Sequence, residues 1–198
     1  MRVVARLAGG AAIGGGAAVA GYVGLVTGAI SPDLGLGRRL RPLGPLDVDI
    51  AAPRDLVFDV IAQPYVGRQT RAVAEKIKIL ERGADMVLAA HFTRVHKKLV
   101  ARTVETVRFA RPERVDFRLV RGPVPHVVEV FTLTEHDSGT RLDYHGELGT
   151  DLWGLGRWWG DLVAEKWEQV VAGSLASIQA EAERRATSNR RALRVVGN

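Results

Sequence analysis

Six stretches in the middle of the chain have the residue pattern of β-strands. They either alternate apolar and polar positions or are rich in β-branched and aromatic residues. These stretches cover residues 72–81, 85–95, 99–109, 114–121, 126–135 and 140–150. Short turn sequences such as Arg111-Pro112-Glu113 separate them. Consecutive strands with short connections predict an antiparallel meander.

Other elements flank this meander on both sides. Residues 46–50 alternate as a short first strand, and an apolar stripe after Pro53 predicts one or two short helices. After Thr150 the pattern becomes helical and continues to about Arg185. One long helix covers only one face of a sheet. We therefore expect an α+β fold, in which a curved antiparallel seven-stranded sheet wraps around a long C-terminal helix.

One register of the predicted strands is apolar and is expected to face the helix. It includes Val107, Phe117, Phe131 and Tyr144, whereas the other register carries most of the charges. The apolar register therefore supplies the predicted wall of a core or of a pocket.

Three acids interrupt this apolar register, namely Glu75, Glu105 and Glu129. Burying a carboxylate costs roughly several kcal/mol unless it is paired or takes up a proton. Together with Tyr144, these acids are candidates for polar anchors in the wall of an apolar pocket. A one-residue β-bulge would instead turn any of them towards solvent.

All four tryptophans lie within residues 151–171. On a helical wheel, Trp159, Val163 and Trp167 fall on or beside the face that is expected to meet the sheet. We predict that these three residues line a pocket as part of the core.

The other two tryptophans fall off that face, beside glycines at the start of the helix. Trp153 and Trp158, with Arg157 between them, are candidates for a pocket rim or a membrane contact. An indole ring suits both places, since its body is apolar and its N–H is polar.

The first thirty residues read as a separate segment. Residues 7–30 contain no charge, and eight of these 24 residues are glycine. A membrane anchor, a cleaved signal peptide and a flexible leader all fit this pattern. We expect a membrane-associated protein with one N-terminal transmembrane segment, or alternatively export after cleavage. Small-xxx-small glycine spacing would allow this helix to bind other membrane proteins.

The remaining boundaries follow from composition. Residues 31–45 are rich in Pro, Gly and Arg and are expected to form a linker. Residues 46–186 form the predicted domain, and residues 187–198 a basic, disordered tail.

Charge and cysteine content exclude several functions. The net charge is +6, but no zinc finger, helix-turn-helix or aromatic RNA motif accompanies it, so no nucleic acid partner is expected. The chain has no cysteine, and its five histidines show no helical metal-ligand spacing. We expect no metal and no cofactor.

Four stretches resemble the SRPBCC superfamily of START-like, helix-grip proteins, in its polyketide cyclase/dehydrase-like branch. They are VDIAAPRDLVFDVIAQP, VETVRFARPERVDFRL, SGTRLDYHGELG and the closing helix. The resemblance spans about residues 46–185, and the N-terminal apolar segment lies outside it. It implies a cavity between the sheet and the long helix. Members of the superfamily include lipid and sterol carriers, ubiquinone-binding proteins and aromatase/cyclases.

Three functions remain open at this point. The first is a membrane-tethered protein that binds a hydrophobic small molecule, such as a lipid, an isoprenoid quinone or a polyketide-like aromatic. In that case Glu105, Glu129 or Tyr144 would fix the polar end of the ligand. The second is a cyclase or dehydratase that uses cavity Glu and Tyr side chains for proton transfer. The third is an accessory subunit of a membrane complex.

Overall fold

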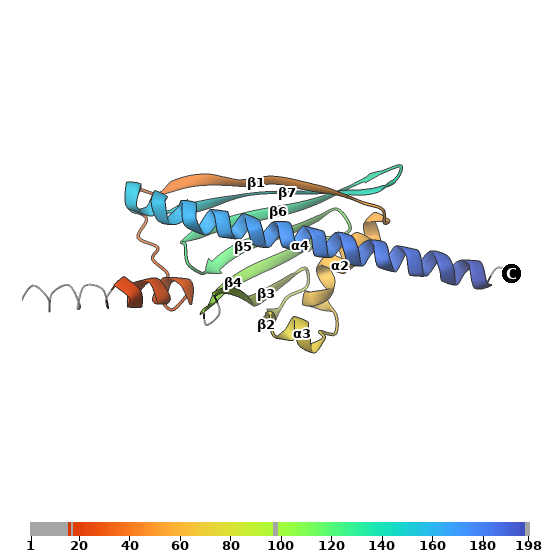
Figure 1. Cartoon of the computed structure of the whole chain (residues 1–198), viewed down its shortest axis with the longest axis horizontal. Coiled ribbons are helices and arrows are strands. Elements are labelled where there is room, and N and C mark those ends of the chain that lie inside the picture. The colour runs from red at the N-terminus through yellow and green to blue at the C-terminus, as the bar shows by residue number, and fades with distance from the viewer. Residues whose placement is uncertain (1–15, 17, 97–98, 197–198) are drawn as a thin grey trace, which may run out of the picture.

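The protein folds as a curved antiparallel sheet gripping one long helix (Figure 1). The computed structural model describes residues 16, 18–96 and 99–196. The strands are β1 (Arg39–Ile50), β2 (Ile77–Arg82), β3 (Met86–His96), β4 (Leu99–Ala110), β5 (Arg114–Arg121), β6 (His126–His136) and β7 (Gly139–Thr150). The helices with these strands are α2 (Arg54–Val66), α3 (Arg71–Ala74) and α4 (Trp153–Val196).

The seven strands lie in the order β1-β7-β6-β5-β4-β3-β2, and each neighbouring pair is antiparallel. The predicted meander and the α+β helix-grip fold are therefore confirmed. The apolar register faces inward: Val107, Val115, Leu142 and Leu148 are all fully buried. Helices α2 and α4 cover this face, and the core lies between them and the sheet (Figure 1).

The first strand is longer than the sequence predicts. β1 begins at Arg39, inside the predicted linker, and its residues up to Leu43 pair with β7. Pro42 and Pro45 made this stretch look irregular. A proline is tolerated at an edge strand or a bulge, where its missing N–H interrupts no ladder. β1 is an edge strand, and its register shifts between Leu43 and Leu46, where Gly44 has a φ of +78°.

The predicted strand over residues 72–81 is a helical turn followed by a shorter strand. Thr70 caps α3 by accepting a hydrogen bond from the backbone N–H of Val73, and β2 starts only at Ile77. Glu75 therefore ends α3 instead of pointing into the sheet's concave face. Its side chain is 69% exposed and pairs with Arg71 at 3.5 Å. The prediction that Glu75 lines a cavity is wrong for this reason.

The last helix is also longer than predicted. α4 continues to Val196, although residues 187–198 were expected to form a disordered tail. Up to residue 192, where the description of burial ends, Ala182 and Ala186 are the last buried residues of α4. Extending an existing helix needs no new nucleus, so polar residues with good helix propensity can continue it without a buried face.

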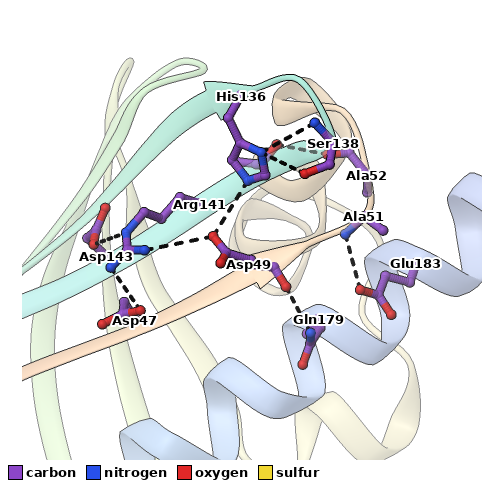
Figure 2. A network of polar contacts seen from close by, with 11 residues as sticks. Asp47, Asp49, Ala51, Ala52, His136, Ser138, Arg141, Asp143, Gln179 and Glu183 are labelled. Atoms are coloured by element: carbon purple, nitrogen blue, oxygen red, sulfur yellow. Dashed lines mark hydrogen bonds and ion pairs between the residues drawn. The ribbon is translucent and has the colours of Figure 1, made fainter.

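Polar contacts fix the β1–β7 end of the sheet to α4 (Figure 2). The Gln179 side-chain amide donates to the Asp49 carbonyl at 2.9 Å, and the Ala51 N–H donates to Glu183 at 3.1 Å. On β7, Arg141 pairs with Asp47 at 2.9 Å. Exposed pairs of this kind each contribute only about 0–1 kcal/mol. They therefore set the position of the helix more than the stability of the fold.

The segment before β1 packs against the domain. Residues 18–26 are helical and lie at the same end of the molecule as the first turn of α4 (Figure 1). The Asp151 carboxylate accepts hydrogen bonds from the backbone N–H groups of Leu34 and Gly35 at 2.6 and 2.8 Å, and from Arg38 at 2.8 Å. Three residues of this segment therefore donate hydrogen bonds to the Asp151 carboxylate.

The membrane-anchor prediction for residues 7–30 concerns a stretch that is only partly described. Residues 1–15 and 17 lie outside the described residues. Of the helices in the described part of the chain, none is both long enough and apolar enough to cross a bilayer.

Candidate ligand cavity

A large cavity lies between the concave face of the sheet, α2 and α4. Its volume is about 1010 Å³. Apolar side chains form most of its wall, among them Ile61 from α2, Phe117 and Phe131 from the sheet, and Val163 from α4. Tyr22 and Val26 of the N-terminal helical segment also line it, and the Tyr22 ring meets Trp159 edge-on at 6.1 Å.

A continuous row of aromatic rings runs from α2 to the sheet along this cavity. Phe117 contacts Tyr65 at a centroid distance of 5.9 Å and Phe131 at 5.4 Å. Phe131 in turn contacts Tyr144 at 5.1 Å. Tilted and edge-on rings at such distances pack favourably. The row fixes the shape of the wall against which a ligand would lie.

Four polar side chains meet on one side of the cavity. Glu105 accepts a hydrogen bond from the Thr103 hydroxyl at 2.5 Å, and its second oxygen lies 3.2 Å from Nδ1 of His91. The His91–Glu105 contact has the distance of an ion pair but not the alignment of a hydrogen bond. On the other side of the imidazole, the Tyr65 hydroxyl lies 3.0 Å from Nε2 of His91.

This arrangement favours the charged forms of Glu105 and His91. Burial is the largest single effect and acts against both charges, but the opposite charge of the partner and the other polar contacts together outweigh it. The pKa of His91 is therefore raised and the pKa of Glu105 is lowered. Burial, followed by the charge of Glu105, raises the pKa of Tyr65. The group is a buried ion pair with a neutral phenol beside it.

Glu129 is the second buried acid, and its surroundings differ from those of Glu105. It is 5% exposed and lies in the cavity wall. Its Oε1 accepts two hydrogen bonds, from the Tyr144 hydroxyl at 2.9 Å and from Nε1 of Trp167 at 2.7 Å. Burial and the nearby charge of Glu105 raise the pKa of Glu129 to about 7, although both donors and His91 oppose the shift.

Most of the predicted cavity residues lie in the wall. These are Glu105, Phe117, Glu129, Phe131, Trp159, Val163 and Trp167. Two other residues that were predicted to line the cavity do not line it. Val107 is 0% exposed and Tyr144 1% exposed, so both are buried behind the wall rather than in it. Tyr144 reaches the site through its hydrogen bond to Glu129 and its ring contact with Phe131.

The predicted rim residues are at the start of α4. Trp153 and Trp158 are 58% and 64% exposed, and Arg157 is also exposed. Trp159 instead donates its indole N–H to the Pro123 carbonyl at 2.8 Å. The four tryptophans therefore divide into two inside the molecule and two on its surface.

Sequence reasoning missed two residues of the site, His91 and Tyr65. His91 lies opposite Thr103 in the β3–β4 ladder, two positions along from the pair of Ala89 with Glu105, so His91 and Glu105 share one face of the sheet. Apolar residues occupy both registers of β3 next to it, so alternation does not show which register faces inward. The register of β3 on β4 also shifts between Arg94 and His96, next to the turn, so the turn alone does not give the pairing of His91 with β4.

A family model described as "Polyketide cyclase / dehydrase and lipid transport" matches residues 46–183. The chain belongs to this family. No curated protein sequence matches it.

Solved structures share the fold at low sequence identity. The Zhui aromatase/cyclase from Streptomyces sp. R1128 has a TM-score of 0.61 and 19% identity, over 75% of this chain and 95% of that one. The di-domain ARO/CYC BexL, from the BE-7585A biosynthetic pathway, has a TM-score of 0.54 and 15% identity, over 76% and 50% of the two chains. Norcoclaurine synthase from Thalictrum flavum, in complex with dopamine and hydroxybenzaldehyde, has a TM-score of 0.50 and 11% identity, over 77% and 87%. Likeness at this level shows the fold alone.

Proposed function

We propose that this protein binds a hydrophobic small molecule in the cavity between the sheet and α4. The observation that supports this best is the cavity itself, with a volume of about 1010 Å³ and a largely apolar wall. An apolar pocket with a few placed polar groups is the usual form of a small-molecule site. A lipid, an isoprenoid quinone and a polyketide-like aromatic are all largely apolar molecules with a few polar groups, and they match such a pocket. The family description, which names lipid transport, agrees with it.

Native mass spectrometry of the full-length protein tests this function. We expect a bound small molecule of apolar composition to copurify. Val163→Trp fills the cavity from α4 and should abolish that adduct, whereas Val120→Trp, at a position 60% exposed on β5, should retain it. Equal adducts in the two variants would contradict binding in this cavity.

A second candidate function is acid/base catalysis of the cyclase or dehydratase type. The specific observation is the Tyr65–His91–Glu105 group, which shares the cavity with Glu129. When His91 is protonated, its Nε2–H donates to the Tyr65 oxygen, which leaves the phenol proton free for a substrate oxygen. A carboxyl with a pKa near the working pH is suited to proton transfer. The similarity to aromatase/cyclase structures supports only the fold in which this would occur.

Turnover of a poly-β-ketone mimic separates the two candidates. Under the catalytic hypothesis, Glu129→Gln reduces kcat by about 100-fold or more, while binding persists. Under the carrier hypothesis the mimic binds and no product forms in either protein.

The proposal includes attachment to a membrane. Apolar side chains are exposed around the start of α4, where the Leu152 N–H donates to the Leu36 carbonyl at 2.8 Å. Leu36, Trp153 and Leu155 are 57%, 58% and 67% exposed. A contiguous exposed apolar surface that includes tryptophan is typical of a membrane or protein contact. If residues 7–30 insert fully, Tyr22 and Val26 must leave the cavity that they line.

Flotation with vesicles of phosphatidylcholine and phosphatidylglycerol tests the attachment. We expect the full-length protein to float with the vesicles and the double variant Leu155→Ser/Trp158→Ser to float less. Val66→Ser, at a position 58% exposed on α2, serves as the control. Full-length protein that remains in the lipid-free fraction would refute membrane attachment without affecting the cavity.

A further inference from the structure

From the geometry around Glu129 we infer that the cavity recognises a hydrogen-bond-accepting oxygen of its ligand, such as a carbonyl, through the neutral carboxylic acid of Glu129. The inference rests on the proposed binding function and specifies the ligand class. It concerns Oε2 of Glu129, a residue of the cavity wall, and whether this oxygen carries a proton.

The two oxygens of Glu129 have different surroundings. Oε1 already accepts from the Tyr144 hydroxyl and from Trp167, whose indole N–H can only donate. No hydrogen bond to Oε2 is formed by the residues that the structure describes. With Oε1 facing two donors, the proton of the neutral acid belongs on Oε2. A neutral Glu129 therefore presents an O–H donor to the cavity.

The charges around the cavity favour the neutral acid. Inside the cavity, the charge of Glu105 opposes ionisation of Glu129, while His91 balances Glu105. The titratable and charged groups that line the cavity or contact Glu129 are Tyr22 from the N-terminal helical segment, Tyr65 from α2, His91 and Arg94 from β3, Glu105 from β4, Tyr144 from β7, Lys76 before β2, and Glu165 and Lys166 from α4. With the Glu105–His91 pair balanced, a neutral Glu129 leaves the polar interior without net charge.

An ammonium ligand fits this site less well than a neutral oxygen. It would require an ionised Glu129 and the burial of its own charge, and buried ion pairs recover their desolvation cost only in good geometry. A carbonyl oxygen needs one donor, and the neutral carboxyl supplies it. The apolar wall then accommodates the remainder of the ligand.

Three probes with one naphthalene skeleton separate these chemistries. They are 2-acetylnaphthalene, which carries a carbonyl, 2-ethylnaphthalene, which has no polar group, and 1-(2-naphthyl)ethylamine, which is an ammonium ion. Isothermal titration of the full-length protein should show the ketone binding more tightly than the hydrocarbon at about pH 6. Between about pH 6 and pH 8 its affinity should fall about tenfold, because binding requires the shrinking neutral fraction of Glu129. Buffers of different ionisation enthalpy should report proton uptake on ketone binding at about pH 8.

Two variants at position 129 make the test specific. Glu129→Gln keeps an oxygen for Tyr144 and Trp167 and turns an N–H donor to the cavity, so it should retain the ketone affinity and lose its pH dependence. Glu129→Leu should bind the ketone no better than the hydrocarbon. Glu135→Gln changes an exposed acid on the same strand and should behave as the wild type. The charge of Glu129 also raises the pKa of His91, so the difference between wild type and Glu129→Gln reports the charge of Glu129 together with its effect on His91.

The possible results have distinct meanings. Ketone and hydrocarbon binding with equal affinity, or amine binding most tightly with proton release, would overturn the role of Glu129 and leave the cavity function standing. Equal ketone affinity in Glu129→Gln and Glu129→Leu would overturn it as well. If none of the three probes binds and no ligand copurifies, the proposed function itself fails, and this inference fails with it.

Discussion

Glu129→Gln should remove a loss of stability that the wild-type protein shows as the pH rises. Folding raises the pKa of Glu129 from 4.5 to about 7. A group whose pKa is higher in the folded state stabilises fully below its unfolded pKa and loses this contribution as the pH rises through its folded pKa. The loss attributable to Glu129 therefore begins above about pH 4.5 and is complete somewhat above pH 7.

The magnitude follows from the size of the shift. At about 1.4 kcal/mol for each pKa unit, the change from 4.5 to about 7 corresponds to about 3 kcal/mol. This is a large part of the ~5–15 kcal/mol by which a protein is usually stable. Glutamine has the same shape and accepts the same two hydrogen bonds, but it does not titrate. The variant should therefore become the more stable protein at alkaline pH.

Urea unfolding followed by tryptophan fluorescence, at several pH values between about 5 and 9, measures this difference. The pKa of His91 is also raised by folding, so its contribution also falls as the pH rises, in both proteins. Subtracting the two curves leaves the contribution of Glu129, including the part of the His91 shift that the charge of Glu129 causes. Parallel curves for wild type and Glu129→Gln would refute the account of Glu129 as a buried acid with a raised pKa. Glu135→Gln provides the exposed control.

Three further variants test other parts of the structure. His91→Ala should lower the free energy of unfolding near neutral pH by about 3–5 kcal/mol in urea titrations, because Glu105 is left buried without its partner charge; a loss below about 1 kcal/mol would mean that the pair is not formed. Gly156→Ala should be strongly destabilising, since its Cβ would lie 1.6 Å from the carbonyl oxygen of Asp151. Its control is Gly173→Ala, whose Cβ would meet no atom within 4 Å and which should raise the free energy of unfolding by no more than about 1 kcal/mol. Asp151→Asn should speed amide hydrogen exchange at Leu34 and Gly35; unchanged exchange there would show that this carboxylate does not hold the segment.

Alternation along the strands was enough to predict the meander and the inward direction of Glu105 and Glu129. Both acids lie on strands with a two-residue period of burial, and each acid shares its register with the more buried residues of its strand. Apart from Thr103, which lies on β4 with Glu105, their partners come from other elements, namely β3, β7 and α4. Tyr144 and Trp167 both donate to Oε1 of Glu129 because of how these elements pack, and no single stretch of the sequence predicts that choice of oxygen.

The errors arose where local chemistry and tertiary context disagree. Prolines suggested a linker where an edge strand accommodates them, as at Pro42. Glu75 lies in a β-like sequence that Thr70 caps into a helical turn. Tyr65 stands one position after a proline in α2, so its contact with His91 depends on how that helix packs on the sheet. These features depend on contacts between distant residues, which hydrophobic periodicity does not report.

The indole N–H resonances of the four tryptophans test the central claim most directly. Trp159 and Trp167 line the cavity, and Trp153 and Trp158 are exposed. In a ¹⁵N–¹H spectrum of the full-length protein titrated with 2-acetylnaphthalene, we expect saturable shifts of the Trp159 and Trp167 indoles and intermolecular NOEs from the probe to Trp167. The Trp153 and Trp158 indoles should remain unshifted. Shifts confined to Trp153 and Trp158 would place the probe on the outer surface and contradict a ligand-binding cavity.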